Sequence, residues 1–270
     1  MKKHYKRALT IAGSDPSGGA GIQADLKAFS ACGCYGMTVI TSVVDENTVG
    51  VTGVHPVPVS FVSGQIKSVL DDIGADAVKI GMLHSSGLII AVRDTLKKYD
   101  IRNIVLDPVM VATSGDRLLQ KEAEETLKKE LLPHVRVITP NIPEAEILLG
   151  TKIKNQSDLP LVVKDLSFGQ KISVLLKAGH LFDDELVDVF YNAETDEIVK
   201  LSSRRIQTKN THGTGCTFSS AIAAFLAHGQ ELTQAVRNAK DYMAKAIAAG
   251  AEYEIGKGHG PVHHFFGFWE

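Results

Sequence analysis

Ala8-Leu-Thr-Ile-Ala-Gly13, Ser14-Asp-Pro-Ser-Gly-Gly-Ala-Gly21 and the segment from Ile22 to Ala31 together decide the fold of the chain. The first part is short and apolar, as in a buried strand, and the third has apolar residues at helical spacing. A strand, a glycine-rich loop and a helix in this order are typical of ligand-binding α/β folds. The loop has neither the Lys-Ser/Thr pair of a P-loop nor a G-x-G-x-x-G fingerprint. Taken alone, it is equally compatible with a tight structural turn.

The same alternation of strands and helices continues along the chain. Strands are predicted at residues 35–44, 77–82, 103–110, 135–139 and 172–180, and helices at 61–73, 85–99, 121–132, 157–168 and 233–249. Residues 54–58 are predicted to be irregular, whereas residues 186–191 and 198–206 alternate like an antiparallel pair. The pattern predicts an α/β fold with a doubly wound, mostly parallel sheet, helices on both faces and a small antiparallel addition.

Length, charge and cysteine content narrow the class of protein. A chain of 270 residues with 44% hydrophobic content fits one α/β domain, and we expect residues 1–270 to form it. The 29 basic and 31 acidic residues give a formal net charge of -2, which predicts no nucleic-acid or membrane partner. The basic start, residues 1–7, leads into an apolar run too short for a signal peptide, so we expect a cytoplasmic protein. Three cysteines support neither a disulfide framework nor a zinc site.

A second glycine-rich loop lies near the C-terminus, in Asn210-Thr-His-Gly-Thr-Gly-Cys-Thr-Phe-Ser-Ser220. Gly213 and Gly215 allow a sharp turn, and the small and apolar residues that follow predict a buried helix. A helix start with free amides binds anions and suits the charge of a phosphoryl group in transfer. A thiol at this position has a lowered pKa, so Cys216 is a candidate base for a substrate hydroxyl. The alternative is a plain turn followed by a small buried cysteine.

Polar residues follow several predicted strands, where α/β sheets bind ligands. Glu46 follows the strand 35–44 and could accept hydrogen bonds from an amino-substituted ring, or it is an exposed loop acid. Asp107, Asn141 and Glu144 supply oxygen ligands of the kind that hold Mg²⁺ beside a nucleotide, although Asn141 could instead cap a helix. Lys177 could reach a phosphate or simply be solvated.

Two further segments have distinctive compositions. Residues 111–117 are small, polar and glycine-containing, which is typical of a mobile flap. The C-terminal residues hold His259, His263 and His264 among aromatics, without a cysteine or carboxylate to complete a metal site. We therefore expect a packed tail rather than a metal site.

The motifs in combination are similar to those of hydroxymethylpyrimidine kinase/phosphomethylpyrimidine kinase, a family of the ribokinase-like fold. The residues that carry the resemblance span nearly the whole chain: Ala12-Gly-Ser-Asp-Pro-Ser-Gly-Gly-Ala-Gly-Ile-Gln-Ala-Asp25, Glu46-Asn-Thr48, Lys79-Ile-Gly-Met82, Asp107-Pro-Val-Met110, Thr139-Pro-Asn141 with Glu144, Lys209-Asn-Thr-His-Gly-Thr-Gly-Cys-Thr217, Gly256-Lys-Gly258 and Gly260-Pro-Val-His-His264. The resemblance implies a three-layer αβα fold and a homodimer. It also implies ATP-dependent phosphorylation of 4-amino-5-hydroxymethyl-2-methylpyrimidine, and then of its monophosphate, for thiamine synthesis.

The resemblance also implies a role for particular residues. The catalytic group would be Gly213, Thr214, Gly215 and Cys216, with Cys216 in the place of the Asp base of ribokinase relatives. The pyrimidine would contact Gly13, Ala20, Val44, Glu46, Met82 and Val109. Asn141, Lys177, Lys209 and Thr211 would lie toward ATP, and Asp107 and Glu144 toward Mg²⁺. Ala178 stands where relatives often have glycine, which affects only the expected local backbone.

Two other functions remain open at this point. Relatives that phosphorylate pyridoxal share the Gly-x-Gly-Cys loop, so a pyridoxine/pyridoxal kinase or a dual-specificity kinase is the alternative within enzymes. A ligand-binding sensor that has lost phosphoryl transfer is the alternative from another class, because fold does not imply function. The intact set of Asp107, Glu144, Lys177 and Cys216 argues against the sensor.

Overall fold

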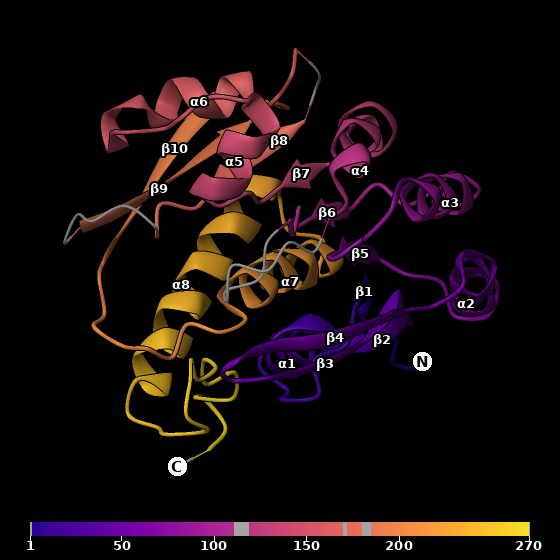
Figure 1. The fold of residues 1–270 in the computed structure, drawn as a ribbon, viewed down its shortest axis with the longest axis horizontal. Helices are drawn as coiled ribbons and strands as arrows, with labels where there is room; N and C mark the ends of the chain where they lie inside the picture. The colour runs from indigo at the N-terminus through magenta and orange to yellow at the C-terminus, as the bar shows by residue number, and fades with distance from the viewer. Residues whose placement is uncertain (1, 111–118, 170–171, 180–184, 270) are drawn as a thin grey trace.

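The sheet at the centre of the molecule has parallel strands and one antiparallel edge. The computed structural model describes residues 2–110, 119–169, 172–179 and 185–269. Its sheet strands are β1 (Arg7–Ala12), β2 (Tyr35–Ile40), β5 (Ala77–Ile80), β6 (Ile104–Leu106), β7 (Val137–Ile138), β8 (Ser173–Leu176), β9 (Glu185–Asn192) and β10 (Glu197–Arg204). Within the described residues the order is β10-β9-β8-β7-β6-β5-β1-β2 (Figure 1). In this part of the chain β9 pairs antiparallel with both β8 and β10, and the other neighbouring strands pair parallel.

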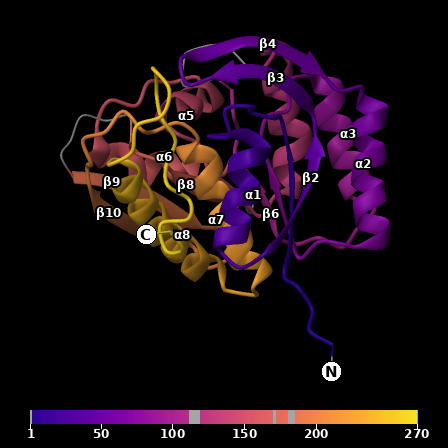
Figure 2. The ribbon, with the colours of Figure 1, turned by 90° about the horizontal axis from the view of Figure 1, so that it is seen from below.

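Helices cover both faces of this sheet (Figures 1 and 2). One layer contains α1 (Gly21–Ala31), α7 (Thr214–Ala227) and α8 (Leu232–Gly250). The other contains α2 (Val59–Asp72), α3 (Ser86–Leu96), α4 (Lys121–Thr126), α5 (Ile142–Leu149) and α6 (Leu159–Asp165), with a π-helical segment at Leu127–Leu131 and 3₁₀ turns at Leu132–His134 and Gln156–Asp158. The predicted three-layer, mostly parallel α/β fold is therefore confirmed.

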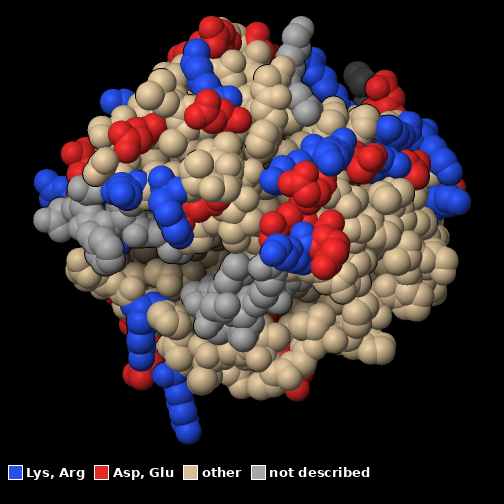
Figure 3. Space-filling model, turned by 45° about the horizontal axis from the view of Figure 1, so that its top comes forward, with Lys and Arg blue, Asp and Glu red and all other residues tan. Residues whose placement is uncertain are grey.

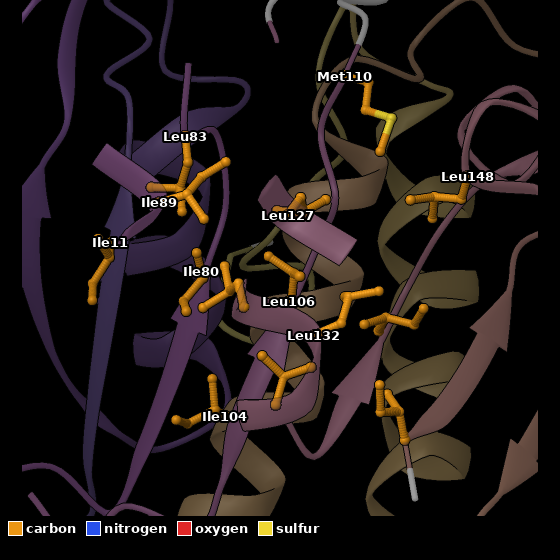
Figure 4. Packing of buried hydrophobic residues seen from close by; sticks show 14 of the residues in the cluster. Ile11, Ile80, Leu83, Ile89, Ile104, Leu106, Met110, Leu127, Leu132 and Leu148 are labelled. Carbon is orange, nitrogen blue, oxygen red and sulfur yellow. The ribbon is translucent and has the colours of Figure 1, made fainter. Parts of the chain in front are cut away.

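Alternation along the central strands explains why two layers are needed. Ala8 and Val105 face the layer of α1, α7 and α8, whereas Leu9 and Leu106 belong to the core on the opposite face. Strands buried on both faces read as continuous apolar runs, as these do. Figure 4 shows Ile80 and Leu106, from the neighbouring strands β5 and β6, among the side chains of this core together with Leu127 and Leu132. Leu106 is fully buried, so truncating it to alanine would cost about 2–5 kcal/mol of folding free energy.

The predicted single strand at residues 35–44 is wrong. The main-sheet strand ends at Ile40, where the Gln65 side chain bonds both backbone groups of Ile40 at 3.0 Å and so replaces a continuing strand partner. The chain then forms a separate antiparallel hairpin, β3 (Ser42–Asn47) with β4 (Gly50–Pro56). The prediction of irregular structure at 54–58 is also wrong for 54–56, which lie in β4. We call residues 42–56 the hairpin.

The strand order creates a crevice above the centre of the sheet. From β1 the chain passes through α1 to β2 on one side, whereas β5, β6, β7 and β8 follow one another on the other side. Ligands bind at such a switch point, outside the carboxyl ends of the strands. The loop 13–21 after β1, Asp107 after β6 and Lys177 after β8 all begin at this edge. The fold thus gathers residues that are far apart in sequence.

Candidate active site

A cavity of about 580 Å³ lies at the carboxyl ends of the parallel strands. All the predicted site residues except Lys209 line it: Gly13, Ala20, Val44, Glu46, Met82, Asp107, Val109, Asn141, Glu144, Lys177, Thr211, Gly213, Thr214, Gly215 and Cys216. Lys209 is exposed and lies outside the lining. Its backbone carbonyl accepts hydrogen bonds from Thr211 N and from His259 Nδ1, which hold this part of the loop beside the tail. The predicted flap at 111–117 lies outside the described residues.

The start of α7 leaves backbone amides free to bind an anion. Gly213 precedes the helix in the left-handed conformation, with φ of 74°. A side chain there would overlap the Gly19 carbonyl from the first glycine loop, so only glycine fits. Among the described residues, the backbone amides of Gly213, Gly215 and Cys216 have no hydrogen-bond partner. Free amides at the start of a helix stabilise negative charge.

Cys216 is only partly exposed at this helix start. Burial raises the pKa of its thiol to about 12, although the Lys79 ammonium and a hydrogen bond from the Gly21 amide lower it. The prediction of a lowered pKa is therefore wrong for the site without ligands. Removing water from a thiolate costs more than these two groups return.

A buried ion pair that the sequence analysis missed lies beneath Cys216. Lys79 Nζ lies 2.8 Å from both carboxylate oxygens of Asp25, and both side chains are fully buried. Thr10 Oγ1 and Ser220 Oγ donate to the same carboxylate at 2.6 and 2.7 Å. Burial lowers the pKa of Lys79, but the charges of Asp25, Cys216 and Asp107 raise this pKa by more. The Lys79 ammonium therefore stays protonated. A lysine inside an otherwise apolar strand was the sequence signal for this pair.

Asp107, Glu144 and Lys177 form a charged group on the other side of the helix start. Asp107 Oδ1 accepts from Lys177 Nζ and from Thr139 Oγ1, each at 2.9 Å. Burial raises the pKa of Glu144 to about 7, opposed by Lys177 and reinforced by Asp107. Burial lowers the pKa of Lys177, but Asp107 and Glu144 raise it above its ordinary value. A side chain at Gly215 would come 3.2 Å from Lys177 Nζ, so glycine keeps the lysine beside the free amides.

These carboxylates fit a magnesium ion. Mg²⁺ is usually held by one or two carboxylates together with substrate phosphates and water. Asp107 Oδ2 is not used by the hydrogen bonds above, and the raised pKa of Glu144 reflects a carboxylate that lacks enough neighbouring positive charge. Asn141 does not offer its side-chain oxygen freely, because it accepts from Glu144 N in a capping box at the start of α5. The capping alternative for Asn141 is thus confirmed.

A second cluster, Asp15, His212 and Glu46, lies at the opposite end of the cavity. Asp15 accepts from His212 Nε2 at 2.8 Å and from the amides of Ser17, Gly19 and Ala20. Burial raises the pKa of Asp15, but these hydrogen bonds hold it below its usual range. The pKa of His212 is lowered by burial and raised more strongly by Asp15 and Glu46.

Glu46 completes this cluster at the cavity wall. Its Oε1 lies 3.9 Å from His212 Nε2, and burial and the Asp15 charge raise its pKa. Although the three groups lie close enough for one metal ion, Asp15 is already saturated with donors. We therefore interpret them as a hydrogen-bonded wall. Asp15 and His212 were missed because nothing in the sequence links residues 197 positions apart.

The remaining wall comes from the C-terminal half. Met243, Ala244, Ile247 and Phe218 make it apolar, and Lys240 lies at its rim. Lys240 Nζ donates to Asp188 Oδ2 at 2.7 Å, and Ala178 N donates to Asp188 Oδ1 at 2.7 Å. A flat apolar wall beside the charged group of Lys177 is suited to the base of a nucleotide. Sequence reasoning predicted the helix α8 but not this role.

The tail is packed, as predicted. His264 is buried and its Nε2 shares a 2.9 Å hydrogen bond with Thr217 Oγ1. His263 contacts the rings of Tyr253 and Trp269. On the face drawn in Figure 3, basic and acidic side chains of the described residues are intermixed rather than gathered in one basic area. None of the helices among these residues has the length and apolar character of a membrane span.

Comparisons with known proteins show the family of the chain. The model of the phosphomethylpyrimidine kinase family matches residues 15–263. A hydroxymethylpyrimidine/phosphomethylpyrimidine kinase of Rhizobium meliloti (strain 1021) is 48% identical, over 97% of this chain and 98% of the relative. An ADP complex of Bacillus subtilis pyridoxal kinase has a TM-score of 0.87 at 38% identity, covering 97% of this chain and 98% of that one. Phosphomethylpyrimidine kinase from Clostridium difficile 630 has a TM-score of 0.78 at 45% identity, covering 89% and 99%.

The three-layer fold and the anion site between two polar clusters define a small-molecule kinase of the ribokinase-like class. With a family model that covers most of its length, the chain belongs to the phosphomethylpyrimidine kinase family. The resemblance found in its motifs is thereby confirmed, and the sensor alternative loses its support.

Proposed function

We propose that this kinase uses ATP to phosphorylate 4-amino-5-hydroxymethyl-2-methylpyrimidine, and then the resulting monophosphate, in thiamine biosynthesis. The observation that carries the proposal is the set of free amides at the start of α7, between the Glu46 cluster and the Lys177 group. With this arrangement, a ring site would lie on one side of a phosphoryl site and a nucleotide site on the other. A phosphoryl group can then pass in line between the two ligands.

Glu46 would recognise the ring. Its carboxylate can accept hydrogen bonds from the amino group of the pyrimidine, while Gly13, Val44, Met82 and Val109 provide close or apolar walls. Gly13 has no room for a side chain, because an added Cβ would lie 2.7 Å from Met82 Cε. The ring would thus be held with its hydroxymethyl group toward Cys216.

Cys216 would accept the proton of the attacking hydroxyl. For this its thiolate must form, and Lys79 and the Gly21 amide are the groups of this chain that stabilise the negative sulfur. The free amides of Gly215 and Cys216 would bind the charge that develops on the phosphoryl oxygens.

On the nucleotide side, Lys177 would contact the phosphates of ATP. Asp107 and Glu144 would hold Mg²⁺, which would offset phosphate charge when bound. We also propose that residues 1–270 form one kinase domain and that the enzyme is a cytoplasmic homodimer, as the family resemblance implies. Sedimentation of the purified protein tests the dimer.

A coupled assay of ADP release, with and without the hydroxymethylpyrimidine, tests the function. We expect turnover that depends on the pyrimidine and a further transfer to its monophosphate. Cys216→Ala should still bind the pyrimidine while losing about 10²-fold or more in kcat. ADP release that does not depend on the pyrimidine would exclude pyrimidine phosphorylation as the function. Near-normal turnover of Cys216→Ala would exclude Cys216 as the base.

Pyridoxal phosphorylation is the second candidate, favoured by the TM-score of 0.87 to the Bacillus subtilis pyridoxal kinase. Its substrate also carries a hydroxymethyl group on a ring, so the same phosphoryl site would serve. The ratio of kcat/KM for the two compounds measures the preference, because specificity is a ratio of these values. We expect the ratio to favour the pyrimidine.

A further inference from the structure

The segment 256–264 passes between the tip of the hairpin and the second glycine loop (Figures 1 and 2); we call it the C-terminal strap. At the hairpin, His259 N donates to Thr48 O at 2.8 Å and Gly258 N donates to Thr48 Oγ1 at 3.2 Å. At the loop, His212 N donates to Gly260 O at 3.0 Å. The strap therefore bonds two of the three segments that carry the Glu46 cluster, the hairpin with Glu46 and the second glycine loop with His212.

The strap is itself anchored to the body of the protein. Just before the strap, the carbonyls of Gly250 and Tyr253 accept from Asn210 Nδ2 of the second glycine loop, each at 2.7 Å. His263 N donates to Ala246 O at 3.0 Å, and Tyr242 OH donates to His264 O at 2.9 Å. These contacts attach the strap to α8, so it is a fixed support rather than a loose tail.

Three strap glycines permit unusually close approach, and the first is Gly256, where an added Cβ would overlap the Thr48 side chain. A Cβ at Gly258 would overlap the backbone carbonyl of Thr48, and one at Gly260 would overlap the side chain of Asn210. Gly267, farther along the same tail, has open space around its Cβ position. The need for glycine is thus confined to positions where the strap meets the hairpin and the loop.

The hairpin needs such support. It forms a separate two-stranded sheet, and an isolated two-stranded hairpin is marginally stable in water. Its base is tied to the body through Val44 N, which donates to Ser14 Oγ, and Val57 N, which donates to Thr41 O. Its tip is held through Thr48, two positions from Glu46.

We propose that the C-terminal strap is a positioning segment for the ring substrate. By holding Thr48 with one part and His212 with the next, it sets the separation between Glu46 and His212, which are 3.9 Å apart. The strap bonds α8, which also carries the apolar wall, at Tyr242 and Ala246, whereas Gly258 and His259 bond the hairpin. A change at Gly258 should therefore weaken ring binding and leave ATP binding nearly unchanged. This inference rests on the proposed function only in naming the ring.

The test compares Gly258→Ala with Gly267→Ala in the full-length kinase. We expect Gly258→Ala to raise the KM for the hydroxymethylpyrimidine about tenfold or more while the KM for ATP changes less than twofold. Gly267→Ala should match the wild type in both. Thr48→Val, which removes the Oγ1 acceptor but keeps the carbonyl, should raise the pyrimidine KM by about threefold.

Two results would overturn the proposal. One is a Gly258→Ala variant with a wild-type pyrimidine KM. The other is an equal loss for pyrimidine and ATP, accompanied by a lower Tm, which would make the strap a general structural element. Wild-type turnover with pyrimidine is measured first, and if pyridoxal is the better substrate the same comparison is made with it. The wild-type measurement tests the proposed substrate, and the comparison of variants tests the role of the strap, so the two proposals can fail independently.

Discussion

Lys79 and Asp25 form a fully buried ion pair, with the lysine Nζ 2.8 Å from both carboxylate oxygens. The pair lies under the candidate base, and the positive charge of Lys79 lowers the pKa of Cys216 against the effect of burial. Desolvating two charges is costly, so such pairs are rarely kept for stability alone. We interpret this one as a source of fixed charge for the sulfur.

Replacing Asp25 with asparagine should leave Lys79 without its counter-charge. Because removing one partner of a buried pair leaves an uncompensated charge, we expect a loss of about 3–5 kcal/mol in the free energy of unfolding. Urea denaturation measures it. The matched control is Asp94→Asn, which breaks the exposed pair with Arg93 and should cost at most about 1 kcal/mol. Equal effects of the two changes would contradict the role of burial.

The thiol of Cys216 should be hard to ionise in the free enzyme. Its pKa of about 12 predicts that the alkylation rate with iodoacetamide keeps rising with pH above about pH 10 and shows no inflection near the value of about 8.5 for a free cysteine. Peptide-resolved mass spectrometry separates it from Cys32 and Cys34. The urea-unfolded chain is the control, and an inflection near pH 8 in the folded protein would disprove the raised pKa.

Glu144 should make the protein less stable as the pH rises. Its pKa in the folded chain is about 7, above the value of about 4.3 for a solvated glutamate. The folded state therefore binds this proton more tightly, and the stabilisation present below about pH 4 is lost as the pH rises through 7. Relative to Glu144→Gln, which does not titrate, wild-type stability should fall by up to about 3 kcal/mol between pH 4 and pH 8.

Urea denaturation at several pH values, without Mg²⁺, measures this difference. Glu146 on the same helix is the control: burial raises its pKa, but the hydrogen bonds from Lys152 and Ile153 N and the Lys152 charge together lower it more. Its Gln variant should show a small difference of the opposite sign. A difference for Glu144→Gln that does not depend on pH would rule out the raised pKa.

The two lysines predicted from sequence to lie toward ATP should differ in effect. Lys177 lines the cavity beside Asp107, whereas the Lys209 side chain lies outside it. Lys177→Met should raise the KM for ATP about tenfold or more and lower kcat, since a charged contact to phosphate is lost. Lys209→Met should change both less than twofold. Similar losses in the two variants would contradict the position of Lys209.

Much of the fold could be predicted because the strands are buried on both faces. Continuous apolar runs such as residues 8–12 indicate central strands of an α/β sheet. The carboxyl ends of parallel strands meet at one edge of that sheet. That geometry brought Asp107, Lys177 and Glu46 together without any knowledge of contacts. The hairpin was missed because its division from β2 depends on Gln65, a side chain on the next helix.

The electrostatics of the site could be predicted less well. The helix start at Gly213 was evident from its glycines, but the pKa of Cys216 depends on how much water the folded walls exclude. Likewise, Asp15 and His212, or Asp25 and Lys79, become partners only through the fold. Residue types and strand ends indicate where ligands bind. The pKa values and ion pairs of the site depend on burial and on neighbours that only the folded chain brings together.

The contact of Gly213 with the Gly19 carbonyl has a consequence for biosynthesis of the enzyme. The two loops are far apart in the sequence, so a ribosome must translate past Cys216 before the phosphoryl site can exist. Nascent chains that carry the first glycine loop, the hairpin and most of the sheet cannot yet turn over ATP. Catalysis is thereby deferred until the polypeptide through His264 has emerged from the exit tunnel.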